Sequence, residues 1–139
     1  MKMKVLIADA DKEVRNNILE TLRLNLKEGR RIQFIETSSG KLTLAELILE
    51  KPDIALIDIN LPEIGALEIL STLKYLGKSE LISIPVIVMT LRTEKKILME
   101  MLKLGARDFL VKPIDIESLI KKVEYLMSGN NISDEKEQS

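Results

Sequence analysis

Two kinds of hydrophobic spacing alternate along this 139-residue chain, and their alternation limits what the chain can fold into. Short continuous apolar runs are typical of buried strands, whereas apolar residues that recur every three or four positions indicate one face of a helix. Strands that alternate with helices form a parallel sheet joined by right-handed crossovers. The sequence therefore predicts a doubly wound α/β domain with helices on both faces of the sheet. The predicted strands span residues 4–8, 32–35, 54–59, 84–89 and 108–111.

The predicted helices follow these strands and end at residues that stop helices. The second stops near Lys51, because the proline that follows disfavours a helical residue before it. The third closes at Gly77, and the last two end at Gly105 and near Gly129, since glycine readily adopts the left-handed conformation found after a helix. The helical patterns cover about residues 14–26, 42–48, 66–76, 97–104 and 116–126.

The composition supports one core and excludes several classes of function. Apolar residues make up 45% of the chain but aromatic residues only 3%, so aliphatic side chains and Met must fill the core. The chain has no Cys and no His, which excludes thiol nucleophiles, disulfides, Cys- or His-based metal sites and the usual general base. Chemistry must therefore come from carboxylates, hydroxyls, lysine and a hard cation. The lack of Cys also fits a cytoplasmic location.

The net charge and the hydropathy of the chain give no reason to expect binding to nucleic acid or insertion into a membrane. The 21 basic and 22 acidic residues give a net charge of -1, so no overall field attracts nucleic acid or an anionic membrane. No segment is long and apolar enough to cross a bilayer. Past the last helical pattern the sequence is polar and weakly patterned. We therefore expect one domain over residues 1–128 and a tail, or the start of a linker, over 129–139.

Asp58 is the strongest functional signal, because it lies inside an apolar strand where a carboxylate is costly without a charged partner. Candidate partners follow the other strands, where ligands of open α/β sheets bind: Asp9 and Asp11 after the first, Thr90 after the fourth and Lys112 after the fifth. Clustered oxygen ligands favour Mg²⁺, Mn²⁺ or Ca²⁺, and a lysine with a hydroxyl suits a phosphoryl group. A carboxylate is then the natural nucleophile, which would give an aspartyl phosphate.

Four separated segments carry motifs that together are specific: VLIADAD (5–11), PDIALIDINLP (52–62), IPVIVMT (84–90) and GARDFLVKP (105–113). They resemble the receiver domains of response regulators in two-component signalling, over roughly residues 3 to 128. The resemblance implies the flavodoxin/CheY-like fold, a five-stranded parallel sheet in the order 2-1-3-4-5. It also implies a phosphorelay, with a sensor histidine kinase or a phosphotransfer protein as partner. Such a domain is a phosphoacceptor rather than an enzyme, with at most self-phosphotransfer and autodephosphorylation.

The resemblance assigns roles around the acceptor. Asp58 resembles the residue that takes the phosphoryl group, and Asp9 the first acid of a pair that binds Mg²⁺. Asn60 matches the position whose backbone carbonyl completes the metal shell. The second acid of the pair is replaced by Ala10, so metal binding is expected to be weak, to recruit Asp11, or to be lost.

The resemblance also assigns a switch. Thr90 resembles the hydroxyl that moves toward the phosphoryl group, and Phe109 the aromatic residue that rotates inward on activation. Lys112 resembles the lysine that pairs with acceptor and phosphate, and its bond to Pro113 would be cis. Leu91 departs from the pattern, which has a small residue there, and we expect it to cover part of the site.

Simpler interpretations remain for each residue. Asp58 and Lys112 form a structural ion pair in one of them, Asp11 caps the following helix, and Thr90 and Phe109 are ordinary strand residues. The surface over residues 94–125 is either solvated or a face for a homodimer or an effector. Two functional hypotheses follow: a phosphorylatable receiver, or a pseudo-receiver that binds proteins independently of phosphate. An unrelated flavodoxin-like enzyme is disfavoured because the chain has no glycine-rich phosphate loop.

Overall fold

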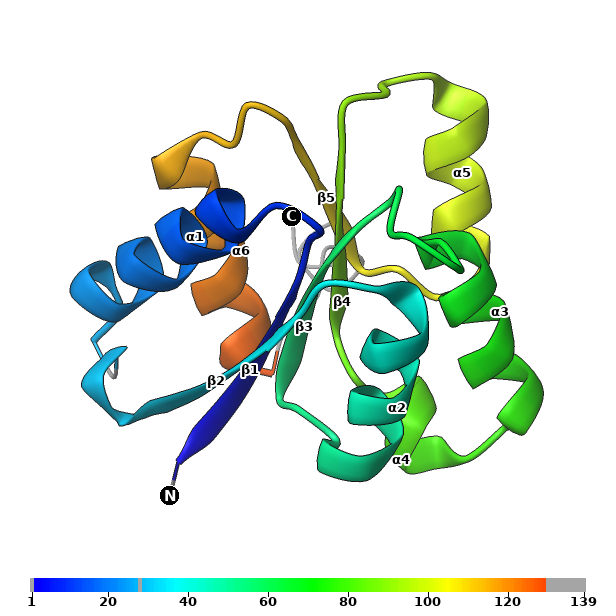
Figure 1. Ribbon diagram of the computed structural model, residues 1–139, viewed down its shortest axis with the longest axis horizontal. Helices are drawn as coiled ribbons and strands as arrows, with labels where there is room; N and C mark the ends of the chain where they lie inside the picture. Colours follow the sequence, from blue (N-terminus) through cyan, green and yellow to red (C-terminus); the bar gives the residue numbers. More distant parts are fainter. Residues whose placement is uncertain (1, 28, 130–139) are drawn as a thin grey trace.

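The computed structural model describes residues 2–27 and 29–129, and these form one five-stranded sheet in which all strands are parallel (Figure 1). The strand order is β2-β1-β3-β4-β5, which confirms the predicted topology. Each strand overlaps one of the predicted runs. The strands are β1 Met3–Ala8, β2 Ile32–Thr37, β3 Ile54–Asp58, β4 Val86–Thr90 and β5 Asp108–Val111. The sequence from residue 130 onward lies outside the described part.

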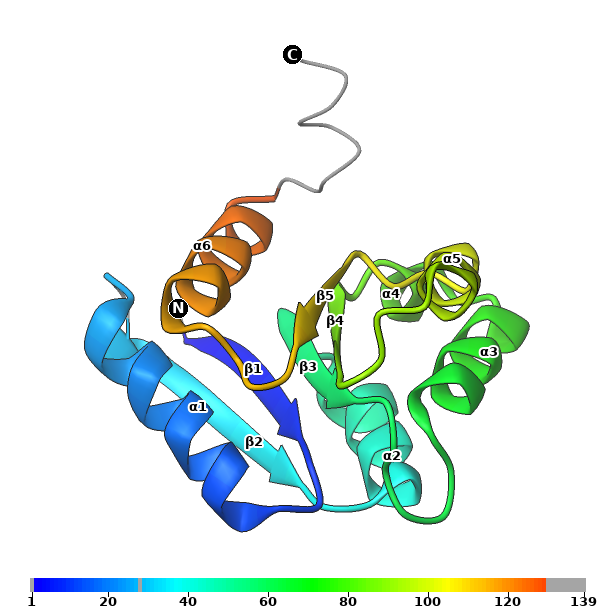
Figure 2. The ribbon, with the colours of Figure 1, turned by 90° about the horizontal axis from the view of Figure 1, so that it is seen from above.

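Helices cover both faces of the sheet, as predicted, and Figure 2 shows the two groups on opposite sides of the strands. One face carries α1 (Lys12–Asn25) and α6 (Ile116–Met127). The other face carries α2 (Gly40–Glu50), α3 (Ala66–Leu76), α4 (Ser79–Ile82) and α5 (Lys95–Lys103). The four-residue helix α4 and a 3-10 turn over Gly29–Arg31 were not predicted, because segments this short show no periodicity.

The two faces of the sheet bury alternate residues of each strand, which gives two hydrophobic cores. In β1, Val5 and Ile7 pack with α1 and α6, whereas Leu6 and Ala8 pack with α2 and α3. All four of these side chains are fully buried. Strands buried on both faces are expected of a parallel sheet, and they explain the unbroken apolar runs in the sequence.

The predicted helix ends are confirmed. Gly77 and Lys51 follow α3 and α2 in the left-handed conformation, with φ of 67° and 45°. Gly105 and Gly129 have φ of 109° and 88°. Within the described residues, no helix is long and apolar enough to cross a bilayer.

Candidate functional site

The register of the sheet brings the carboxyl ends of β1, β3 and β4 to one level. Ala8 pairs with Ile57, and Asp58 pairs with Met89, so the residues that follow β1 and β4 flank Asp58. The amide of Lys112 donates to the Thr90 carbonyl at 2.8 Å, which brings the end of β5 to the same edge. The sheet therefore gathers residues that are far apart in sequence.

One lysine joins the buried Asp9 and the partly buried Asp58. Lys112 Nζ donates to Asp9 Oδ2 at 2.6 Å and lies 3.3 Å from Asp58 Oδ1. The side chains of Asp9 and Asp58 are only 3% and 14% exposed, and that of Lys112 is 19% exposed. Their opposite charges therefore interact with little solvent screening. Two carboxylates on one ammonium leave one negative charge without a protein counter-charge, which favours a cation at this position.

Burial and charge shift the pKa values of this cluster. The pKa of Asp58 is raised above 3.8 because burial disfavours its charged form, and Asp9 adds to the rise while Lys112 and the Asn60 backbone oppose it. Burial alone would lower the pKa of Lys112. Its contacts with Asp9 and Asp58 outweigh burial and raise the pKa of Lys112 above 10.5. The lysine is therefore a fixed cation at neutral pH.

Asp9 is held by several elements at once. Its amide donates to the Thr37 carbonyl of β2 at 3.1 Å, and its Oδ1 accepts from the Asp11 amide at 2.9 Å. With Lys112 on Oδ2, both carboxylate oxygens have partners on different segments. The orientation of this acid is therefore fixed before any ligand binds.

The carboxylates fit a hydrated magnesium ion. Mg²⁺ commonly binds one or two carboxylates and keeps several waters or phosphate oxygens, and Asp9 and Asp58 supply two. Asp11 is turned away from this task, since its carboxylate accepts from the Glu13 amide and caps α1. Ala10 is exposed and offers no ligand. No group of three acidic side chains forms a metal cluster anywhere in residues 2–27 and 29–129, so protein side chains alone would not enclose an ion.

The hydroxyl of Thr90 is bound to the loop after β4 rather than to Asp58. It accepts from the Arg92 amide at 2.9 Å and donates to the Arg92 carbonyl at 3.3 Å. Leu91 is 72% exposed, and its expected cover over part of the site stays a prediction.

The remaining predicted residues lie on β5 and just after it. Phe109 packs, half-buried, against the core shared with α3 and α5, and is not in the carboxylate cluster. The Lys112–Pro113 peptide is cis, as the resemblance implied. Lys122 of α6 donates to the Phe109 carbonyl at 2.6 Å and to Asp108 Oδ1 at 3.2 Å, and so ties α6 to β5.

Sequence inspection missed two charged groups: Arg15, which binds the Asp9 carbonyl, and Lys122, which binds the amino end of β5. Arg15 lies one helical turn after Asp11, and that spacing places it on the side of α1 that faces the loop from β1. The spacing was a usable signal for Arg15. Nothing in the sequence marks Lys122, which has other lysines close by in the chain.

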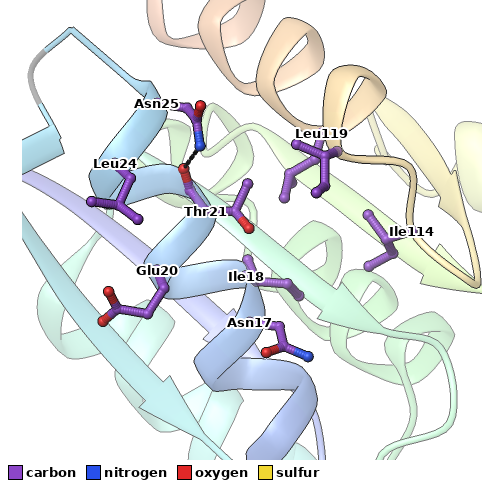
Figure 3. A pocket seen from close by; sticks show the side chains of 9 residues that line it. Asn17, Ile18, Glu20, Thr21, Leu24, Asn25, Ile114 and Leu119 are labelled. Atoms are coloured by element: carbon purple, nitrogen blue, oxygen red, sulfur yellow. Dashed lines mark hydrogen bonds between the residues drawn. The ribbon is translucent and has the colours of Figure 1, made fainter.

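A cavity of about 420 Å³ lies between α1 and α6, away from the carboxylates (Figure 3). Ile18, Ile114 and Leu119 form its apolar wall, and Asn17 and Thr21 line it from α1. A second cavity of about 300 Å³, lined in part by Lys112 and the same Ile18 and Ile114, continues toward the site. The first cavity gathers no set of titratable groups, so the chemistry stays at the strand ends.

Comparison with known proteins gives consistent results. A family model described as the response regulator receiver domain matches residues 5–124. Protein PilH of Pseudomonas aeruginosa is 31% identical over 103 residues, which are 74% of this chain and 82% of PilH. The transcriptional regulatory protein KdpE of Mycobacterium tuberculosis is 29% identical over 121 residues, 87% of this chain and 51% of KdpE. The chain thus spans about half the length of KdpE.

Solved structures share the fold. The receiver domain of the Francisella response regulator 1452 superposes with a TM-score of 0.80 at 28% identity, covering 92% of this chain and 98% of that one. The chemotaxis response regulator CheY4 of Vibrio cholerae gives a TM-score of 0.77 at 23% identity, covering 91% and 99%.

Proposed function

The chain belongs to the response regulator receiver family, and from this premise we propose that Asp58 accepts a phosphoryl group from a sensor histidine kinase or a phosphotransfer protein. One observation carries the proposal: Asp58 and Asp9 meet on the single cation Lys112 at the carboxyl end of the sheet. A purely structural ion pair would need one acid. The second acid leaves an excess negative charge that a phosphate-binding cation neutralises.

In the proposed reaction a carboxylate oxygen of Asp58 attacks the phosphorus of the donor. A bond from oxygen to phosphorus forms, the bond from phosphorus to the donor nitrogen breaks, and that nitrogen keeps the electron pair and takes up a proton from water. Lys112 offsets charge on the transferred group and holds Asp58 in line. Mg²⁺, held by Asp9, Asp58 and the Asn60 carbonyl, would supply further charge neutralisation.

The raised pKa of Asp58 suits this role. Burial makes the ionised carboxylate a stronger base than a solvated one, and therefore a better nucleophile. Lys112 remains charged at neutral pH and so keeps the acid from becoming too basic to ionise. Burial and Lys112 thus have opposite effects on the pKa of Asp58.

Signalling would follow from movement of Thr90. Its hydroxyl must leave the Arg92 backbone to reach a phosphoryl group on Asp58. The loop from Leu91 to Glu94 is exposed, so its rearrangement breaks few packing contacts. The surface over residues 94–125 would then change its affinity for a second copy or an effector, in the cytoplasm and without direct binding to nucleic acid or membrane.

The second candidate is a pseudo-receiver that binds partners without phosphorylation. Ala10 is the observation behind it, because this position offers no second metal ligand. The meeting of Asp9 and Asp58 on Lys112 favours the first candidate.

Phosphorylation can be tested with acetyl phosphate and Mg²⁺ by intact mass. We expect a single phosphoryl adduct that is absent in Asp58→Asn. Asp53→Asn is the matched control, since Asp53 lies at the opposite, exposed end of the same strand and accepts from the Lys4 amide at 2.7 Å. This variant should be modified like the parent chain. The proposal fails if no adduct forms and beryllofluoride with millimolar Mg²⁺ produces no spectral response.

A further inference from the structure

Arg15 joins three elements behind the candidate site. Its Nη1 donates to the backbone carbonyl of Asp9 at 2.7 Å, and its Nε donates to Glu36 Oε1 at 3.1 Å. The side chain is only 14% exposed although it lies in the first turns of α1. A guanidinium presents donors in a fixed fork, so one side chain can bind both oxygens at once.

The Asp9 carbonyl has no place in the sheet ladder. The last β1–β2 pair is Ala8 with Thr37, and Asp9 follows it. Its amide still donates to the Thr37 carbonyl, but its own carbonyl faces the turn and accepts from Arg15. Ala10 comes next, and its exposed methyl group forms no hydrogen bond. Arg15 therefore fixes the plane of the peptide between Asp9 and Ala10.

The position of this peptide determines where the Asp9 carboxylate points. The amide that binds Oδ1 belongs to Asp11, only two residues further along. The Asp11 carbonyl in turn accepts from the Arg15 amide at 3.1 Å. Arg15 thus holds the turn at both ends, through its guanidinium on Asp9 and through its backbone on Asp11. If the first contact is lost, rotation of the peptide displaces the donor that orients the carboxylate.

We propose that Arg15, held by Glu36, is a positioning residue that orients Asp9 for a divalent cation beside Asp58. The inference rests on the proposed function, because that function gives Asp9 its cation. Arg15 does not touch the reacting atoms. Its importance follows from Ala10: with no second acid in the turn, the orientation of Asp9 alone decides what this strand offers to the ion.

The test compares Arg15→Gln with the parent chain by two readouts. The first is the rate of phosphorylation by acetyl phosphate as a function of Mg²⁺ concentration. The second is Mn²⁺ binding to the unphosphorylated protein, followed by the loss of the free-ion paramagnetic resonance signal. We expect the half-saturating Mg²⁺ concentration and the Mn²⁺ dissociation constant to rise about tenfold, the size of one charge-assisted hydrogen bond. The maximal rate should fall less than about threefold, because Asp58 and Lys112 are unchanged.

Two further variants show whether the effect is specific. Arg15→Lys keeps a cation but cannot bridge both oxygens, so it should recover only part of the affinity. Arg23→Gln is the matched control: Arg23 is on the same helix and pairs with Glu20 at 2.9 Å, but at an exposed position. It should leave both metal readouts unchanged. If Arg15→Gln does not fold, Glu36→Gln replaces it, with an expected change of about threefold.

The outcomes separate this inference from the proposed function. A variant that loses thermal stability but keeps the parent's metal dependence makes Arg15 a structural residue only and overturns the inference. So does a parent chain that binds no Mn²⁺. A parent chain that binds Mn²⁺ more tightly than Arg15→Gln but is never phosphorylated supports the inference and refutes the proposed function.

Discussion

At the carboxyl end of the sheet, the β1 side and the β4 side are held in different ways. Asp9, after β1, has hydrogen bonds from its amide, its carbonyl and both carboxylate oxygens, and these reach α1, β2 and the segment after β5. Among residues 2–27 and 29–129, the hydroxyl of Thr90, at the end of β4, bonds only to the backbone of Arg92, two residues away. A long-range network fixes the first group, whereas a local turn holds the second.

The helices that follow these strands repeat the difference. The first, α1, buries Ile18, Leu19 and Leu22 and is capped by the Asp11 side chain. By contrast, α5 fully buries only Met101, and its N-cap residue Glu94 makes no side-chain capping bond. The carboxylates are therefore preorganised, while the hydroxyl and its helix can rearrange at low cost. This division suits a site in which the chemistry is fixed and the response to it is movable.

Replacing the central cation should give the largest effect. In Lys112→Met the two acids lose their shared partner, and we expect the free energy of unfolding at pH 7 to fall by about 3 kcal/mol. Urea denaturation measures this change. Because the pKa of Lys112 is raised, its stabilisation is fully present below pH 10.5 and is lost as the pH rises through the raised value. The difference between parent and variant should therefore shrink in strong base.

Arg92→Met also removes a cation, but on the β4 side of the site. The pair of Arg92 Nε with Glu94 Oε2, at 3.0 Å, is more than half exposed at both side chains. Its loss should cost less than about 0.5 kcal/mol. Equal losses in the two variants would remove the proposed contrast between a rigid and a movable side.

Hydrogen exchange should show the difference between the helices directly. We expect the slowest backbone amides of α5 to open with a free energy about 2 kcal/mol lower than those of α1, because α5 buries fewer side chains. Exchange followed by NMR at several denaturant concentrations gives these free energies. Adding beryllofluoride and Mg²⁺ should change the protection of α5 more than that of α1. Equal protection in the free protein would contradict the comparison.

The sequence predicted the elements well because their signals are local. Buried strands appear as apolar runs, and the end of α3 is marked by Gly77, whose φ of 67° is costly for other residues. The short helix α4 was missed because four residues cannot show a 3.6-residue period.

The candidate site was predictable only as far as strand ends mark it. Asp58 could be identified because an acid within an apolar run is costly, and Lys112 because it ends a strand. The link from Arg15 to Glu36 could not be found this way, since the two lie 21 residues apart on separate elements and both suit a solvated surface. That Thr90 bonds to Arg92 also depends on side-chain rotation, which no sequence pattern records.

A further prediction concerns Asp58, the proposed acceptor. In Asp58→Asn the buried charge is removed while Lys112 keeps Asp9, and we expect the variant to be about 1 kcal/mol more stable than the parent at pH 7. The sign follows from the pKa of Asp58, which is raised in the folded state. Below pH 3.8 Asp58 is protonated in both the folded and the unfolded chain, so burying it does not lower the free energy of unfolding. As the pH rises from 3.8 through the raised pKa of the folded state, the parent loses stability and the variant does not. Urea denaturation from pH 3 to 8 on both chains measures this, and Asp53→Asn should differ from the parent by less than about 0.5 kcal/mol throughout. A less stable Asp58→Asn at neutral pH would mean that Lys112 more than compensates the burial of Asp58, and Asp58 would then belong wholly to the rigid side of the site.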